Sequence, residues 1–146
     1  MTIFTVATVG FVDDVRGLLT VRKRGTSRFM LPGGKIESGE SALAALVREV
    51  EEELGVTLDP ATVTPLGTFS AAAANEAGAA VVATAFSALA PSHPQPRNEI
   101  AELRWIPLDE LAAELASAPG GVPADLAPLL ALQIGPELLR RRTKPL

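Results

Sequence analysis

The sequence contains no cysteine, no tyrosine and only one histidine among its 146 residues. Without cysteine there can be no disulfide scaffold, zinc–thiolate site, iron–sulfur cluster or thiol nucleophile. A single histidine also excludes a metal site built from several imidazoles. Any metal bound by this chain must therefore be held by carboxylate and carbonyl oxygens, which are the ligands that suit Mg²⁺ or Mn²⁺.

The sequence also lacks long apolar runs and an excess of basic charge. No apolar run approaches the roughly 20 residues of a membrane-spanning helix, and no basic region precedes the apolar N-terminal stretch as in a signal peptide. Thirteen basic and 17 acidic residues give a net charge of −4, whereas proteins that bind nucleic acid polymers are normally basic. We therefore predict a cytoplasmic protein without membrane or nucleic-acid partners, folded as a single domain over residues 1–146.

The alternation of apolar segments and turn residues predicts an α+β domain with a central mixed β-sheet. We expect strands at residues 2–9, 18–24, 63–70, 81–89 and 103–106, of which the first two form a hairpin. We expect helices at about 41–54, 108–116 and 126–142. The last helix is expected to break at Gly135-Pro136. Pro32-Gly33-Gly34 is expected to form a tight turn that lets the backbone approach a phosphate or metal ion.

The helix expected at 41–54 carries an apolar face and an acidic face. The apolar face consists of Leu43, Leu46, Val47, Val50 and Leu54. Glu49, Glu52 and Glu53 have the spacing that brings side chains together on a helix, and they lie near its C-terminus, the unfavourable end for anions. A divalent cation would relieve their repulsion. The alternative is a solvated acidic face without a metal.

The residues that precede the acidic face favour the metal site. Glu40 lies just before the helix, where a carboxylate is stabilised by the N-terminal dipole. Arg48 is the sole basic residue of the helix, and we expect it to bridge to Glu40 or to orient Glu49.

Together these residues resemble the Nudix box. Its specified positions are filled by Gly34, Glu40, Arg48, Glu49, Val50, Glu52, Glu53, Gly55 and Val56. Chance would produce the seven fixed identities on the order of once in 10⁸ start positions, so the resemblance is specific over residues 34–56. It implies an α/β/α sandwich with a catalytic loop–helix–loop. It also implies an Mg²⁺- or Mn²⁺-dependent hydrolase of a nucleoside diphosphate linked to another group.

The resemblance further implies roles for individual residues. The metal-binding positions are the carbonyl of Gly34 and the carboxylates of Glu49, Glu52 and Glu53. The residues that support the catalytic loop are Gly33, Glu40, Arg48 and Gly55. The general base is either Glu49 or a later glutamate. We favour Glu99 as this base or as an extra metal ligand, with Glu102 or neither as the alternatives, since both could simply face solvent.

Four further positions have two interpretations each. Trp105 is expected to pack rather than to stack on a nucleobase. Phe29 could line a pocket or the core, and one of residues 22–24 could reach a phosphate. His93 is expected in an exposed loop, with a contact to the substrate as the alternative.

The choice of substrate class is narrowed mainly by residues and motifs of related hydrolases that this sequence lacks. The tyrosine typical of diadenosine polyphosphate hydrolases and the proline typical of ADP-ribose hydrolases are missing, as are the NADH-type and coenzyme A-type signatures. What remains is a MutT-like hydrolase that splits nucleoside or deoxynucleoside triphosphates, oxidised ones included, to a monophosphate and pyrophosphate. The alternatives are another small-molecule nucleotide, such as ADP-ribose or a nucleotide sugar, and a non-catalytic nucleotide sensor. A homodimer also stays open.

Overall fold

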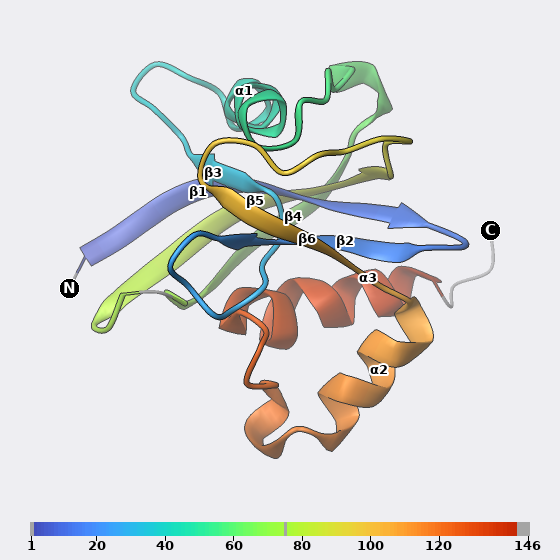
Figure 1. Ribbon diagram of the computed structural model, residues 1–146. Coiled ribbons are helices and arrows are strands. Elements are labelled where there is room, and N and C mark those ends of the chain that lie inside the picture. Colours follow the sequence, from blue (N-terminus) through green and yellow to red (C-terminus); the bar gives the residue numbers. More distant parts are fainter. Residues whose placement is uncertain (1, 75, 143–146) are drawn as a thin grey trace.

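The computed structural model describes residues 2–74 and 76–142 (Figure 1). Its centre is a mixed sheet formed by β1 (Thr2–Asp13), β2 (Gly17–Lys23), β3 (Gly33–Lys35), β4 (Thr64–Ala72), β5 (Ala79–Leu89) and β6 (Ile100–Ile106). The strand order is β4-β5-β1-β2-β6. β3 pairs with the same edge of β1 as β2 does, nearer the start of β1. β1 and β5 are parallel, whereas the other pairs are antiparallel. The predicted mixed sheet and the hairpin of its first two strands are confirmed.

Helices cover both faces of the sheet. In Figure 1, α1 (Ala42–Leu54) lies above it, and α2 (Leu108–Ser117) and α3 (Gly135–Arg142) lie below it. Successive side chains of a strand point to opposite faces, so Ala7, Val9 and Phe11 of β1 join the core cluster beneath α1. A second cluster packs the C-terminal helices against the opposite face. The result is the expected α/β/α sandwich.

Local signals explain the predicted helix α1. Ser41 caps its N-terminus by accepting a hydrogen bond from the amide of Ala44 at 3.0 Å. Gly55 ends the helix in the left-handed conformation (φ 67°). The predicted apolar face packs into the core, and three of its members are fully buried: Leu46, Val50 and Leu54.

The tight turn predicted at Pro32-Gly33-Gly34 is wrong, because Gly33 and Gly34 belong to strand β3. They pair with Thr8 and Ala7 of β1. Gly33 has φ 144°, and a Cβ there would lie 2.0 Å from the carbonyl oxygen of Ala7. Glycine is normally weak in strands, which is why the sequence pattern hides this one.

The break predicted at Gly135-Pro136 is also wrong. A π-helical turn at Leu130–Ile134 runs directly into α3, and the amide of Gly135 donates to the carbonyl of Leu130. The wider turn lets the helix continue even though Pro136 has no amide hydrogen to donate. None of the helices in residues 2–74 and 76–142 has the length and apolar character needed to cross a bilayer.

Candidate active site

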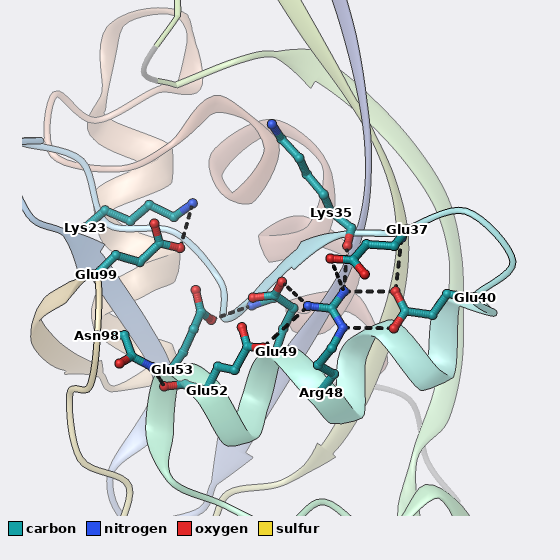
Figure 2. A network of polar contacts seen from close by, with 11 residues as sticks. Lys23, Lys35, Glu37, Glu40, Arg48, Glu49, Glu52, Glu53, Asn98 and Glu99 are labelled. Carbon is teal, nitrogen blue, oxygen red and sulfur yellow. Dashed lines mark hydrogen bonds and ion pairs between the residues drawn. The ribbon is translucent and has the colours of Figure 1, made fainter.

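The candidate site lies where the C-terminal half of α1 meets β3 and the loop that precedes β6 (Figure 2). The loop is fastened to the last turn of the helix. The side-chain amide of Asn98 donates to the carbonyl of Glu52 at 2.7 Å, and the backbone amide of Arg97 donates to the carbonyl of Glu53 at 2.9 Å. These bonds satisfy carbonyls that a helix end leaves without partners. They also bring Glu99 to the acidic face of α1.

Glu53 is the most unusual member of the site, because this acidic residue is only 2% exposed. One oxygen, Oε1, accepts a hydrogen bond from the amide of Gly33 at 2.9 Å. The other, Oε2, has no partner among the described residues. Burial raises the pKa of Glu53 to about 8, with Glu49 and Glu99 adding to the rise and Lys23 opposing it. An unpaired buried carboxylate oxygen calls for a proton or a cation.

Glu49 lies against β3 and against Arg48. Its Oε1 is 2.8 Å from Nη1 of Arg48. Burial raises the pKa of Glu49 above its usual range, although the charge of Arg48 opposes the rise. A Cβ on Gly34 would lie 2.4 Å from the carboxyl carbon of Glu49. Only glycine at position 34 therefore lets this carboxylate approach the β3 backbone so closely.

Arg48 and Glu40 form a two-pronged ion pair. Nε and Nη2 of Arg48 donate to the two oxygens of Glu40 at 2.8 and 2.9 Å, and Nη2 also donates to the carbonyl of Lys35 at 3.1 Å. The hydrogen bonds from Arg48 lower the pKa of Glu40 to about 2, and those bonds raise the pKa of Arg48. Arg48 thus ties the loop before α1 to β3 and to Glu49, which is the geometry that the predicted supporting role needs.

The remaining candidate carboxylates differ in their surroundings. Glu52 is half exposed and lies 3.7 Å from Arg48. Glu99 is 59% exposed and lies 3.6 Å from Nζ of Lys23, and its charge helps to raise the pKa of Glu53. Glu102 instead pairs with Arg22 across β6 and β2 at 2.8 Å. The structure therefore brings Glu99 to the box carboxylates and directs Glu102 to Arg22.

A cavity of about 280 Å³ opens beside this cluster, on the face of the sheet opposite α1. Gly33, Gly34, Lys23 and Lys35 line it together with apolar side chains of β1 and the C-terminal helix. Lys35 also lies over the ring of Phe4, 4.5 Å from its centre. Lys23 is the cation near the carboxylates, because it pairs with Glu99 and its charge lowers the pKa of Glu53. Figure 2 shows the side chain of Lys35 directed away from them, and the acidic Glu76 also lines the cavity.

Sequence reasoning missed two residues of this cavity, and the structure decides between the interpretations of three other positions. Lys35 was not among the candidates, although its position directly after the box glycine could have suggested it. Thr8 of β1 also lines the cavity, and nothing in its local pattern distinguishes it from other strand threonines. Trp105 packs against the core with Arg16 4.0 Å above its ring, Phe29 packs in the second core cluster, and His93 is exposed.

The donor set suits a hard divalent cation. Three carboxylates project from one helical face, and no donor among residues 2–74 and 76–142 bonds to the Oε2 acceptor of Glu53. In the described part of the chain no three acidic or histidine side chains are yet gathered in a metal-binding group. Glu49 is drawn toward Arg48 and Glu52 toward solvent.

Comparison with known proteins places the chain in a family. The family model described as NUDIX domain matches residues 3–126. The chain belongs to this family. It is a hydrolase of phosphoric anhydride bonds with the mixed-sheet Nudix fold. No curated protein matches the sequence.

Solved structures share the fold. The MutT NUDIX hydrolase from Burkholderia pseudomallei has a TM-score of 0.69 at 23% identity, over 98% of this chain and 100% of its own. The MutT protein from Methanosarcina mazei Go1 has a TM-score of 0.69 at 21% identity, over 99% and 97% of the two chains. The E. coli dihydroneopterin triphosphate pyrophosphohydrolase has a TM-score of 0.58 at 18% identity, over 77% and 88%. At these identities the likeness concerns the fold alone.

Proposed function

We propose that the protein is an Mg²⁺- or Mn²⁺-dependent pyrophosphohydrolase that converts a nucleoside or deoxynucleoside triphosphate, oxidised ones included, to a monophosphate and pyrophosphate. The observation that carries the proposal is the buried Glu53 carboxylate, whose Oε2 finds no partner in the part of the chain that the structure describes. It lies next to Glu49 and Glu52 at the edge of a cavity that also holds two lysines.

In this proposal the residues of the box have different roles. Glu49, Glu52 and Glu53 hold the cation, with the carbonyl of Gly34 as a further ligand. When bound, the cation supplies charge neutralisation and lowers the pKa of an attacking water. Arg48 keeps Glu49 and the preceding loop in place, as its contacts with Glu40 and Lys35 support.

Glu99 is our choice for the general base or an additional ligand. It is more exposed than Glu49 and has no arginine partner among the described residues, so it can reach a water and accept its proton. The charge of Lys23 beside it limits the repulsion between Glu99 and the box carboxylates. Glu49 is the alternative base, but its oxygen already accepts from Arg48.

The two lysines and the cavity support a polyphosphate with one ring system. Lys23 and Lys35 both line the cavity, and Lys23 also lies beside Glu99, so positive charge is available to an anionic chain that runs from the cavity to the carboxylates. A volume of about 280 Å³ is at the small end for ligand pockets, which suits a single base.

A cytoplasmic location and the absence of nucleic acid polymers and membranes among the partners are proposed from the charge and composition.

The test is a phosphate-release screen with Mg²⁺ and inorganic pyrophosphatase. The panel holds the common triphosphates, an oxidised guanine triphosphate, ADP-ribose and nucleotide sugars, the last two assayed with phosphatase. We expect pyrophosphate from at least one triphosphate with the wild type and with Glu51→Gln, which changes an exposed residue of the same helix. Glu53→Gln should lose roughly 10²-fold or more.

Two outcomes would contradict the proposal. Turnover of ADP-ribose or a nucleotide sugar without turnover of any triphosphate would replace the substrate class. Nucleotide binding without any turnover would favour the sensor.

A further inference from the structure

The two edges of the sheet differ in how they are protected. The edge strands are β4 and β6. β6 carries the charged residues Glu102 and Arg104, and Arg104 pairs with acidic side chains of α2 and of the loop that follows it. β4 contains no charged residue from Thr64 to Ala72. Charges, prolines and bulges are the usual devices that keep an edge strand from pairing with another chain, so β4 lacks the first of these devices.

The protective devices that β4 does have are confined to its first half. The register of its pairing with β5 shifts between Pro65 and Gly67. The side chain of Arg141 in α3 also donates to the carbonyl of Leu66 at 3.4 Å. After the shift the pairing with β5 is regular as far as Ala72. Alternate residues of this second half are exposed, namely Thr68, Ser70 and Ala72. The second half of β4 is therefore a regular and uncharged edge.

The hydrogen bonds of the β4–β5 hairpin show which backbone groups face outward. The amide of Ala73 donates across the hairpin to the carbonyl of Ala79 at 3.0 Å. In an antiparallel pair the amide and carbonyl of one residue point to the same side, and successive residues alternate. The backbone groups of Thr68, Ser70 and Ala72 therefore point away from β5. Within the described residues, no strand, loop or side chain bonds to them.

A second copy of the same strand complements these groups. Two antiparallel copies related by a twofold axis at Ser70 place Ser70 opposite Ser70 and Thr68 opposite Ala72, so each outward amide meets an outward carbonyl. This register forms about six hydrogen bonds. No like charges meet, because the strand has none. Apolar surface lies nearby as well, since Leu132 is 46% exposed on the helical turn that contacts β4.

We propose that the edge of β4 from Thr68 to Ala72 is a dimer interface, at which two copies of the chain join their sheets antiparallel about Ser70. The second copy is the occupant because the strand complements itself in both hydrogen bonding and charge. Ala72 and the loop after it also line the cavity, so the interface adjoins the cavity. The proposal goes beyond the proposed hydrolase and does not depend on it.

The test measures the mass of the full chain by sedimentation equilibrium over a range of concentrations. The wild type should approach the mass of two chains. Ser70→Pro should raise the Kd of the dimer about tenfold, because it removes one outward donor from each copy. Its missing amide faces away from β5, so the fold should be retained, and circular dichroism checks this.

Two charged variants test whether Ser70 meets its own copy. Ser70→Lys and Ser70→Glu should each raise the Kd of the dimer about fivefold, because like charges then lie opposite each other. An equimolar mixture of the two should return to within about twofold of the wild type, because opposite charges then meet. The control Thr64→Lys places the same charge at an exposed position of β4 before the register shift and should leave the Kd unchanged.

Four outcomes would overturn the proposal. A wild type that stays monomeric at every concentration would leave the edge to an extended segment of a different protein. A dimer unaffected by the Ser70 variants would place the interface elsewhere. Weakening of both charged variants without recovery in their mixture would exclude pairing about Ser70, and equal weakening by Thr64→Lys would make the effect one of net charge. If Ser70→Pro does not fold, the charged variants and their mixture decide.

Discussion

Two arginine-centred clusters of this molecule use the same chemistry for different ends. Arg104 pairs with Glu114 at 2.8 Å, Asp125 at 2.7 Å and Glu110 at 3.4 Å, and so joins β6 to α2 and to the loop that follows it. Arg48 likewise lies among several carboxylates. The second cluster adjoins the buried carboxylate of Glu53, which lies near Glu49 and for which the described residues provide no ion pair.

Glu114 and Glu53 differ in whether a cationic side chain bonds to either oxygen of the carboxylate. Glu114 also has a buried oxygen without a partner, yet its other oxygen is paired with Arg104. The unpaired oxygen of Glu53 belongs to a carboxylate whose only hydrogen bond within the described residues comes from a neutral amide. A buried oxygen without a hydrogen-bond partner therefore suggests a cation site only where neither oxygen of the carboxylate is paired with a cationic side chain.

The largest expected difference in triphosphate turnover is between variants of Glu49 and Glu114, each of which pairs with its arginine at 2.8 Å. Glu49→Gln should reduce triphosphate turnover by roughly 10²-fold, because it removes a proposed cation ligand. Glu114→Gln should leave turnover within about twofold and lower the melting temperature, because it weakens only a structural pair. Steady-state kinetics and thermal melts of both variants test this. Equal losses of turnover would remove the distinction between the clusters.

The buried Glu53 should make the metal-free protein less stable as the pH rises. Below about pH 4.5 its carboxyl is protonated in both the folded and the unfolded chain. Between about 4.5 and 8 the unfolded chain releases this proton while the folded chain retains it, so the free energy of unfolding falls through that window.

Glu53→Gln should abolish this loss and stabilise the metal-free protein at pH 8 by a few kcal/mol. Urea denaturation at pH 5 and pH 8 in the presence of a chelator measures the effect. A Glu53→Gln protein whose stability falls with pH as steeply as the wild type's would show that Glu53 is ionised throughout.

The two arginines should differ in how well lysine replaces them. Arg48→Lys should lower kcat by about tenfold, because lysine cannot form the two-pronged pair with Glu40 that holds the loop and Glu49. Arg104→Lys should change kcat by less than about twofold. If lysine at position 48 leaves kcat intact, the fork geometry has no part in catalysis.

The smallest expected effect is that of the cation on stability. Millimolar Mg²⁺ should raise the melting temperature of the wild type and of Glu114→Gln by a few degrees, because a ligand of the folded state stabilises it. A chelator should reverse the shift, and Glu53→Gln should not show it. A shift that persists in Glu53→Gln would place the cation elsewhere.

The sequence predicted those parts of the fold and site that depend on local spacing. α1 follows from its apolar period, from Ser41 and from Gly55, and the contact between Arg48 and Glu40 follows from their positions around one helix start. The placement of Glu99 beside the box carboxylates was also anticipated. Its proposed role, like those of the box glutamates, stays a prediction.

The features that were missed depend on distant partners. Gly33 is in a strand because β1 lies beside it, and Glu53 is buried because β3 and the loop before β6 cover it. Thr8 is unusual because its hydroxyl, unlike that of Thr20, has no hydrogen-bond partner among the described residues. None of these conditions is visible in a window of neighbouring residues.

The loop bonded to the end of α1 has a mechanical consequence. The amides of Gln95 and Arg97 and the side chain of Asn98 all donate to carbonyls of the last helical turn, and the guanidinium of Arg97 lies where a side chain at position 55 would be. The turn that carries Glu52 and Glu53 and the loop that carries Glu99 are therefore held as one rigid piece, although 46 residues separate Asn98 from Glu52. Any local unfolding that frays the helix end releases both halves of the carboxylate cluster at once, so the site is either assembled or lost as a unit.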